Sequence, residues 1–70
     1  MNNCWISVTE RLPEESGYYI VTAKDGRIAR TTWLMYQVRA KQWVKTGARA
    51  YWVVTHWMPF PAPYIEEEQL

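Results

Sequence analysis

The chain has 70 residues and a formal net charge of +1, and tryptophan and tyrosine each occur five times. This length allows one domain with a very small core, so aromatic rings must supply much of the buried area. With one cysteine (Cys4) and one histidine (His56), the sequence excludes an internal disulfide and a closed tetrahedral metal site. No catalytic constellation is present, so we expect a non-enzymatic protein with no cofactor and no metal.

The N-terminal residues and the longest uncharged run indicate the cellular compartment of the protein. The opening Met1-Asn2-Asn3-Cys4-Trp5 lacks the basic and apolar regions of a secretory signal. The longest uncharged run, residues 50–65, contains three prolines and is shorter than a membrane-spanning helix. We therefore expect a cytoplasmic protein that makes no membrane contact, with the thiol of Cys4 reduced.

Residues 5–8 have the sequence Trp-Ile-Ser-Val and lie close to the N-terminus. Ser7 and Glu10 fit the Ser-x-x-Glu capping box, which predicts one helical turn over residues 9–12. The segment 12–17 has the proline and glycine of a loop. Residues 18–23 are β-branched and aromatic, which is typical of a strand.

A hairpin is expected next. Asp25-Gly26 is a dipeptide favoured in tight type I′ turns, so residues 28–36 should return as a second strand. The alternation in that strand leaves both faces partly apolar, and the pattern alone does not identify the buried one. We favour burial of the Trp33–Met35 face, because that keeps Arg30 in water.

Two further strands follow the hairpin. A basic turn over residues 37–41 leads to a short third strand over 42–45. A loop over 46–49 then precedes a fourth strand over 51–58.

The C-terminal part of the chain is rich in proline and then in glutamate. The prolines of segment 59–63 oppose ladder pairing and predict polyproline II. Residues 65–70 form an acidic tail that we expect to fray. The predicted fold is therefore a small, mostly β domain over residues 1–64, an antiparallel meander of about four strands with at most one short helical turn near the N-terminus.

Several motifs together resemble domain-of-unknown-function family 551. They are Trp5-Ile6-Ser7-Val8, Arg11-Leu12-Pro13, Gly17, Tyr19-Ile20-Val21, and Val54-Thr55-His56-Trp57-Met58-Pro59 with Pro61 and Pro63. The resemblance covers residues 5–63. It implies an accessory protein of a phage or prophage, acting in the host cell cytoplasm, with no assigned catalytic residue. Phe60, where the family usually has leucine, and the basic middle of the chain depart from the family pattern.

The two tryptophan-containing segments 5–8 and 54–59, which we call the terminal phrases, are expected to close the core. The predicted core residues are Trp5, Trp33, Trp57 and Met58. His56 is interpreted as a structural histidine that holds a hydrogen bond, and Arg11 as a residue that stacks or pairs within the fold.

The middle of the chain is basic. Residues 24–49 contain seven basic residues and one acid, interleaved with aromatic residues. Such a segment can be a solvated strand edge protected against aggregation, a surface for an acidic protein, or a surface for single-stranded nucleic acid. The candidate partner-binding residues are Arg30, Tyr36, Arg39, Lys41 and Trp43.

The sequence favours a binding protein. We expect a rigid aromatic-and-arginine face that docks on an acidic surface of a host or phage protein, and that inhibits a host enzyme or host-defence complex by occupying it. Two alternatives stay open. One is a nucleic-acid-binding module using residues 24–49, and the other is a structural subunit that self-assembles through an exposed strand edge.

Overall fold

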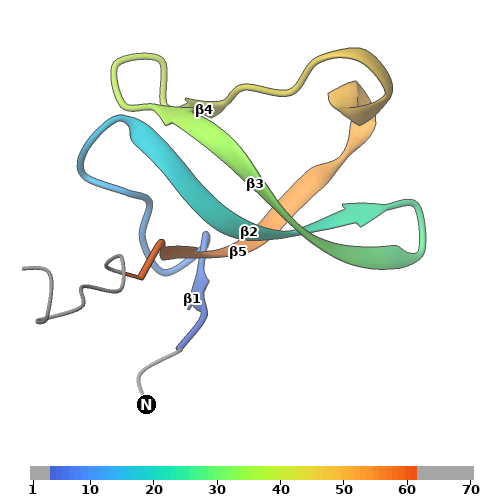
Figure 1. The fold of residues 1–70 in the computed structure, drawn as a ribbon, viewed down its shortest axis with the longest axis horizontal. Helices are drawn as coiled ribbons and strands as arrows, with labels where there is room; N and C mark the ends of the chain where they lie inside the picture. The colour runs from blue at the N-terminus through green and yellow to red at the C-terminus, as the bar shows by residue number, and fades with distance from the viewer. Residues whose placement is uncertain (1–3, 62–70) are drawn as a thin grey trace, which may run out of the picture.

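The computed structural model describes residues 4–61, which form one antiparallel sheet of five strands in the order β1-β5-β2-β3-β4. The elements are β1 (Ile6–Ser7), β2 (Gly17–Asp25), β3 (Ile28–Gln37), β4 (Gln42–Trp43), the 3₁₀ helix η1 (Gly47–Tyr51) and β5 (Val53–Pro59). The long strands twist, so the sheet curls around one side (Figure 1). The predicted small, mostly β class is confirmed. None of the described helices is long and apolar enough to cross a membrane.

The β2–β3 hairpin contains the two longest strands of the sheet. Its ladder runs without interruption from Gly17 opposite Tyr36 to Asp25 opposite Ile28. The tight turn is present as predicted, but its central residues are Gly26 and Arg27. Gly26 has φ 66°, and no positive φ occurs at Arg27. A positive φ at the first central position alone is the type II′ pattern, so the expected type I′ turn is wrong.

Strand β5 departs from the predicted meander. It pairs with β2 on the side away from β3, and its other edge pairs with β1. A bulge interrupts the β2–β5 register, since Thr22 faces His56 while Ala23 faces Val54. The intervening Thr55 donates its hydroxyl to the Thr22 carbonyl at 3.3 Å. Bulges increase local twist, and this one lies where the sheet curls.

The N-terminal phrase forms a strand and a turn. Residues 6–7 are β1, and the amides of Glu10 and Arg11 both donate to the Ser7 carbonyl, at 2.9 and 3.2 Å. The Ser7 hydroxyl accepts from the amide of Thr9 at 3.2 Å. These bonds close a single turn over residues 7–11, about two residues before the one predicted, and the turn does not continue into a helix. The single short helix of the described residues is η1, in and after the predicted loop.

The ends of the later strands also differ from prediction. Strand β4 has two residues, and β5 begins at Val53 because η1 occupies the preceding residues. Pro59 lies opposite Tyr19 as the last residue of β5, so its assignment to polyproline II is wrong. A strand end tolerates proline because the missing amide falls where pairing stops. The predicted acidic tail lies outside the described residues.

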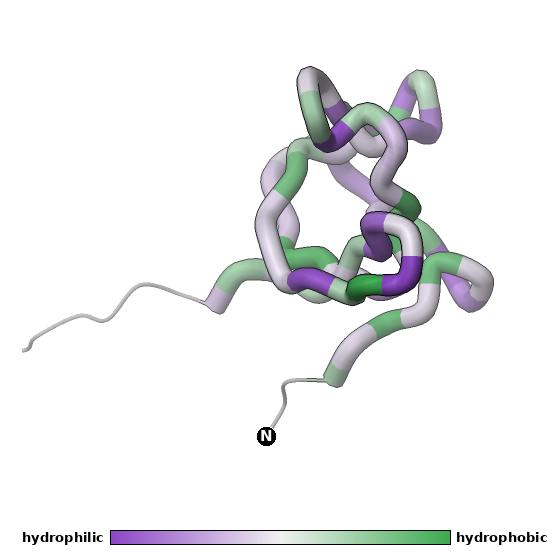
Figure 2. Tube along the Cα trace, turned by 90° about the vertical axis from the view of Figure 1, so that its right-hand side faces the viewer, coloured by the Kyte–Doolittle hydropathy of each residue, from purple (hydrophilic) through white to green (hydrophobic). Residues whose placement is uncertain are grey.

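The inner face of the curled sheet holds the core. Val21, Ala23, Leu34, Val54 and Trp57 form one buried cluster. Figure 2 shows the chain winding around this centre, with hydrophobic and hydrophilic stretches alternating along it.

The register of the hairpin shows which face of β3 is buried. Leu34 lies opposite Tyr19, on the inner face, and is 5% exposed, whereas Trp33 is 54% exposed. The predicted burial of the Trp33–Met35 face is therefore wrong. Arg30 shares the inner face with Leu34, but its side chain extends over the Trp52 ring and stays 48% accessible. Burying this face consequently leaves the Arg30 guanidinium in water.

The terminal phrases do lie side by side, as expected. Ile6 is opposite Trp57, which is 4% exposed and confirmed as core. The indole Nε1 of Trp57 donates to the Arg11 carbonyl at 2.9 Å. The other core predictions are wrong: Trp5 is 40% exposed, and Met58 is half-buried on the outer face. Residues of the first phrase other than Trp5 pack against the core, namely Ile6 and Val8.

Candidate functional site

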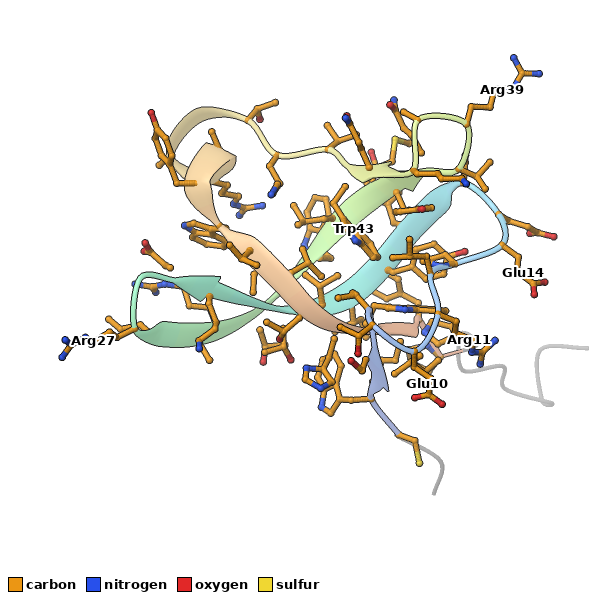
Figure 3. The ribbon with its side chains drawn as sticks, turned by 180° about the vertical axis from the view of Figure 1, so that it is seen from behind. Glu10, Arg11, Glu14, Arg27, Arg39 and Trp43 are labelled. Carbon is orange, nitrogen blue, oxygen red and sulfur yellow. The ribbon has the colours of Figure 1, made fainter. Side chains whose placement is uncertain are left out.

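The residues predicted to bind a partner do not all share one surface, although Lys41 and Trp43 line one cavity. Tyr36 is 1% exposed and belongs to the buried interior, so its assignment to a binding face is wrong. Trp43 is half-buried, with its ring edge-to-face on Tyr36 at 4.8 Å and on Tyr19 at 6.1 Å between centroids. Figure 3 shows Trp43 in the middle of the molecule. These two aromatic residues support the fold.

The predicted basic residues lie at opposite ends of β3. Arg39 and Lys41 are exposed in the turn between β3 and β4. Arg30 lies near the start of β3, roughly 20 Å from this turn at the rise of an extended strand. Figure 3 shows Arg39 at one extremity and Arg27, of the β2–β3 turn, at the other. One hot spot cannot contain both sets.

A different group of cations gathers around Trp52. The guanidinium carbons of Arg30 and Arg49 lie 5.8 and 5.5 Å from the centroid of its ring. The ammonium of Lys45 donates to the Trp52 carbonyl at 2.6 Å. We call Arg30, Lys45 and Arg49 the cationic cluster. Within residues 4–61 its one ion pair joins Arg30 to Asp25, at 3.7 Å. The cluster therefore presents excess positive charge.

The outer face of the hairpin carries an exposed aromatic pair. Tyr18 and Trp33 pack edge-to-face with 5.5 Å between ring centroids, and each is 54% exposed. The half-buried Ile20 and Met35 flank them, because Ile20 lies opposite Trp33 and Met35 opposite Tyr18. Large apolar groups that stay together in water are typical of an interaction surface.

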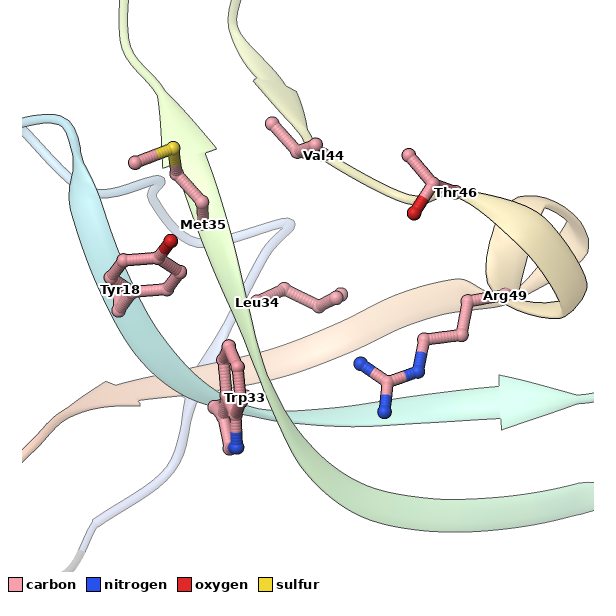
Figure 4. Close-up of a pocket in the computed structure, with 7 residues that line it drawn as sticks. All are labelled: Tyr18, Trp33, Leu34, Met35, Val44, Thr46 and Arg49. Carbon is pink, nitrogen blue, oxygen red and sulfur yellow. The ribbon is translucent and has the colours of Figure 1, made fainter.

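These two features meet in a cavity of about 270 Å³ beside β3, which we call the edge groove. Its lining residues are Tyr18, Trp33, Leu34, Met35, Val44, Thr46 and Arg49. Trp33 and Met35 come from the outer face of the strand and Leu34 from the inner face, so the groove crosses the strand edge. Figure 4 shows Arg49 reaching from η1 toward β3, with Tyr18 on the other side of the strand.

Within the part of the chain that the structure describes, the edge of β3 in this groove is open. Strand β4 pairs with Tyr36 and Gln37, and the amide of Val44 then donates to the Met35 carbonyl at 2.8 Å. Among the described residues no strand continues this ladder beyond Met35. Peptide groups of alternate residues point to the same edge, so those of Trp33 and Thr31 face the opening.

Other titratable groups serve the fold. The Arg11 guanidinium lies 5.8 Å from the Trp57 ring centroid, which confirms its predicted stacking role. His56 is half-buried, with Nδ1 3.0 Å from the Thr55 hydroxyl oxygen. Burial, and secondarily the charge of Glu15, raises the pKa of Tyr19. No cluster of three metal-ligating side chains occurs within residues 4–61.

Sequence reasoning missed the main residues of the groove. Trp33 was assigned to the core because burying its face of the strand was expected to keep Arg30 in water. Arg49 and Lys45 were counted in the basic segment, but no local pattern relates them to Trp52. The contacts arise because η1 carries Arg49 and leads directly into β5 through Trp52, so that the two side chains meet.

Comparison with known proteins gives one match. A family model described as "Protein of unknown function (DUF551)" matches residues 4–64. No curated protein and no solved structure matches the chain.

Proposed function

The chain belongs to the DUF551 family, as its terminal phrases predicted, and we propose that it is a non-enzymatic protein that acts by binding another protein. One observation carries the proposal. An exposed pair of aromatic rings and the arginine of a cationic cluster line the same groove, at an unpaired strand edge.

The chemistry of the groove suits protein recognition. Tryptophan, tyrosine and arginine dominate interface hot spots, because they combine large contact area with directed polar groups. Trp33 and Tyr18 offer half-exposed rings already ordered by their mutual packing, which lowers the entropy cost of binding. Arg49 is likewise held against Trp52. Excess positive charge beside these rings favours a partner with an acidic surface.

The proposed mode of action is occupancy. A protein of this size can block or redirect a larger one by covering a functional surface. In the phage or prophage setting implied by the resemblance, the partner is a host or phage protein in the host cytoplasm. Inhibition of a host enzyme or a host-defence complex is the most concrete form of the proposal.

A capture experiment with matched variants tests it. Tagged protein is expressed in a lysogenic or infected host, and captured proteins are identified by mass spectrometry for the wild type, Trp33→Thr and Arg49→Glu. Val53→Thr is the control, because Val53 is 59% exposed at the start of β5, away from the groove. We expect a partner that is retained by the wild type and the control and lost from both groove variants.

A second control separates the groove from the β3–β4 turn. If Arg39→Glu/Lys41→Glu loses the partner while the groove variants keep it, the turn is the binding face and the groove proposal is wrong. If all variants capture the same proteins, binding through either surface is excluded.

Nucleic-acid binding is the second candidate. Two guanidinium groups beside one indole ring resemble the combination of charge and stacking used for single strands. Such binding must weaken steeply with salt, because phosphate contacts release counterions. A labelled oligothymidylate titrated at low and high salt is the measurement. Salt-sensitive binding that is lost in Arg30→Glu/Arg49→Glu would make nucleic acid the leading partner.

A further inference from the structure

We propose that the partner contributes an extended segment that adds to the open edge of β3 as an extra strand, with alternating apolar and acidic side chains. This inference rests on the proposed function and specifies how the edge groove is occupied. It goes beyond surface contact, because it assigns backbone hydrogen bonds to named residues.

The backbone of β3 supplies the pairing groups. The β4 ladder ends where Val44 donates to the Met35 carbonyl, and the next peptide groups facing that edge belong to Trp33 and Thr31. A segment antiparallel to β3 would continue the line of β4 and exchange hydrogen bonds with both. Strand addition of this kind draws its affinity from main-chain bonds.

The two faces of β3 determine which side chains the segment needs. Residues of the segment opposite Trp33 and Thr31 would place their side chains on the outer face, beside Trp33 and Tyr18. Apolar side chains suit that position, because they cover rings that are half-exposed.

The alternate residues of the segment would point to the inner face. They lie opposite Leu34 and Thr32, on the side where Arg49 and Arg30 contact Trp52. Carboxylates suit this side, because the cationic cluster has a single ion pair among the described residues. Charge complementarity therefore selects an acidic peptide of alternating pattern.

The same charges argue against a second copy of this chain as the occupant. Pairing β3 with β3 would bring the arginines of both copies to one inner face, and juxtaposed like charges are unfavourable. An acidic segment meets no such repulsion.

Matched peptides test the inference. The probe is a short acetylated peptide of alternating glutamate and valine, titrated into ¹⁵N-labelled protein. Two isomers carry backbone N-methyl groups, on the valines in one and on the glutamates in the other. In the proposed register the valine amides face β3 and the glutamate amides face away. Methylation of the valines should weaken binding about tenfold or more, the equivalent of losing one or two hydrogen bonds, while methylation of the glutamates should leave it within about twofold.

The protein signals provide the second readout. Binding should slow amide exchange at Trp33 and Thr31, and a lysine–valine peptide should not bind. Equal affinity of the two methylated isomers, or equal binding of the lysine peptide, overturns strand addition. The proposed function, which the capture experiment tests separately, is not affected by either result. Absence of saturable binding by the glutamate–valine peptide also overturns strand addition. A dimer of the free protein with those two amides already protected would identify a second copy as the occupant instead.

Discussion

The two faces of the β2–β3 ladder differ sharply although their residues are similar. Tyr19 packs edge-to-face on Trp57 at 5.2 Å and on Trp43 at 6.1 Å, within the curl of the sheet. Its neighbour Tyr18 contacts one ring, Trp33, and is 54% exposed. The comparison teaches that a five-stranded sheet of this size can cover one face by curling, and that the other face stays available for a partner.

Trp57 and Trp33 differ in burial in the same way as Tyr19 and Tyr18. Trp57 is enclosed and bonded through its indole nitrogen, whereas Trp33 is held by one aromatic neighbour and faces the edge groove. We infer that Trp57 contributes to folding and Trp33 to recognition. Four predictions test this division, in decreasing order of expected effect.

The largest difference in stability should be that between alanine variants of Trp57 and Trp33. Trp57→Ala should lower the free energy of unfolding by about 3–5 kcal/mol, because it empties the core and leaves the Arg11 carbonyl without its donor. A domain this small would then be largely unfolded. Trp33→Ala should cost about 1 kcal/mol. Urea unfolding followed by circular dichroism measures both. Equal losses would show that the outer face is covered in solution.

The second largest difference in stability should be that between alanine variants of Leu34 and Met35, which are adjacent in β3. Leu34→Ala should cost about 2–3 kcal/mol, since Leu34 is 5% exposed and belongs to the core cluster. Met35→Ala, on the outer face, should cost about half as much. The urea concentration at the midpoint of unfolding, measured for each variant, gives the comparison. A larger loss at Met35 would contradict the assignment of the two faces.

The third prediction concerns alkaline pH. Because burial raises the pKa of Tyr19 above its ordinary value of 10.0, the unfolded chain loses this proton before the folded protein does. Stability should therefore fall as the pH rises from about 10 through the folded pKa. Tyr19→Phe should flatten that decline, and Tyr18→Phe, which removes the same hydroxyl from the outer face, is the matched control. Melting temperatures across this range test it; matching slopes for the two variants would contradict it.

The smallest effect on stability should come from the cationic cluster. Arg49→Glu should change the free energy of unfolding by less than about 1 kcal/mol, because a cation–π contact between two half-buried side chains contributes little. Thermal melts measure this change. A loss comparable to that of Leu34→Ala would show that Arg49 maintains the fold, and the binding loss expected of this variant would then have a structural cause.

The candidate site was only partly predictable. The basic and aromatic character of the middle segment was visible in the sequence, and Arg30, one of the candidate partner-binding residues, belongs to the cationic cluster. Tyr36 was assigned to the wrong side, because apolar residues on both faces of a strand do not indicate which face is buried. Arg49 could not be selected, since its contact with Trp52 depends on the path of η1.

The sequence by itself determined the small β class, the Asp25-Gly26 hairpin, the pairing of the terminal phrases and the family. These follow from local backbone preferences and from motifs that are read residue by residue. The tertiary structure decided which face of the hairpin is buried, that β5 returns to β2, and that β3 keeps an edge unpaired by any strand of residues 4–61. Those outcomes depend on the direction in which the sheet curls, a property of all five strands together that no single segment encodes.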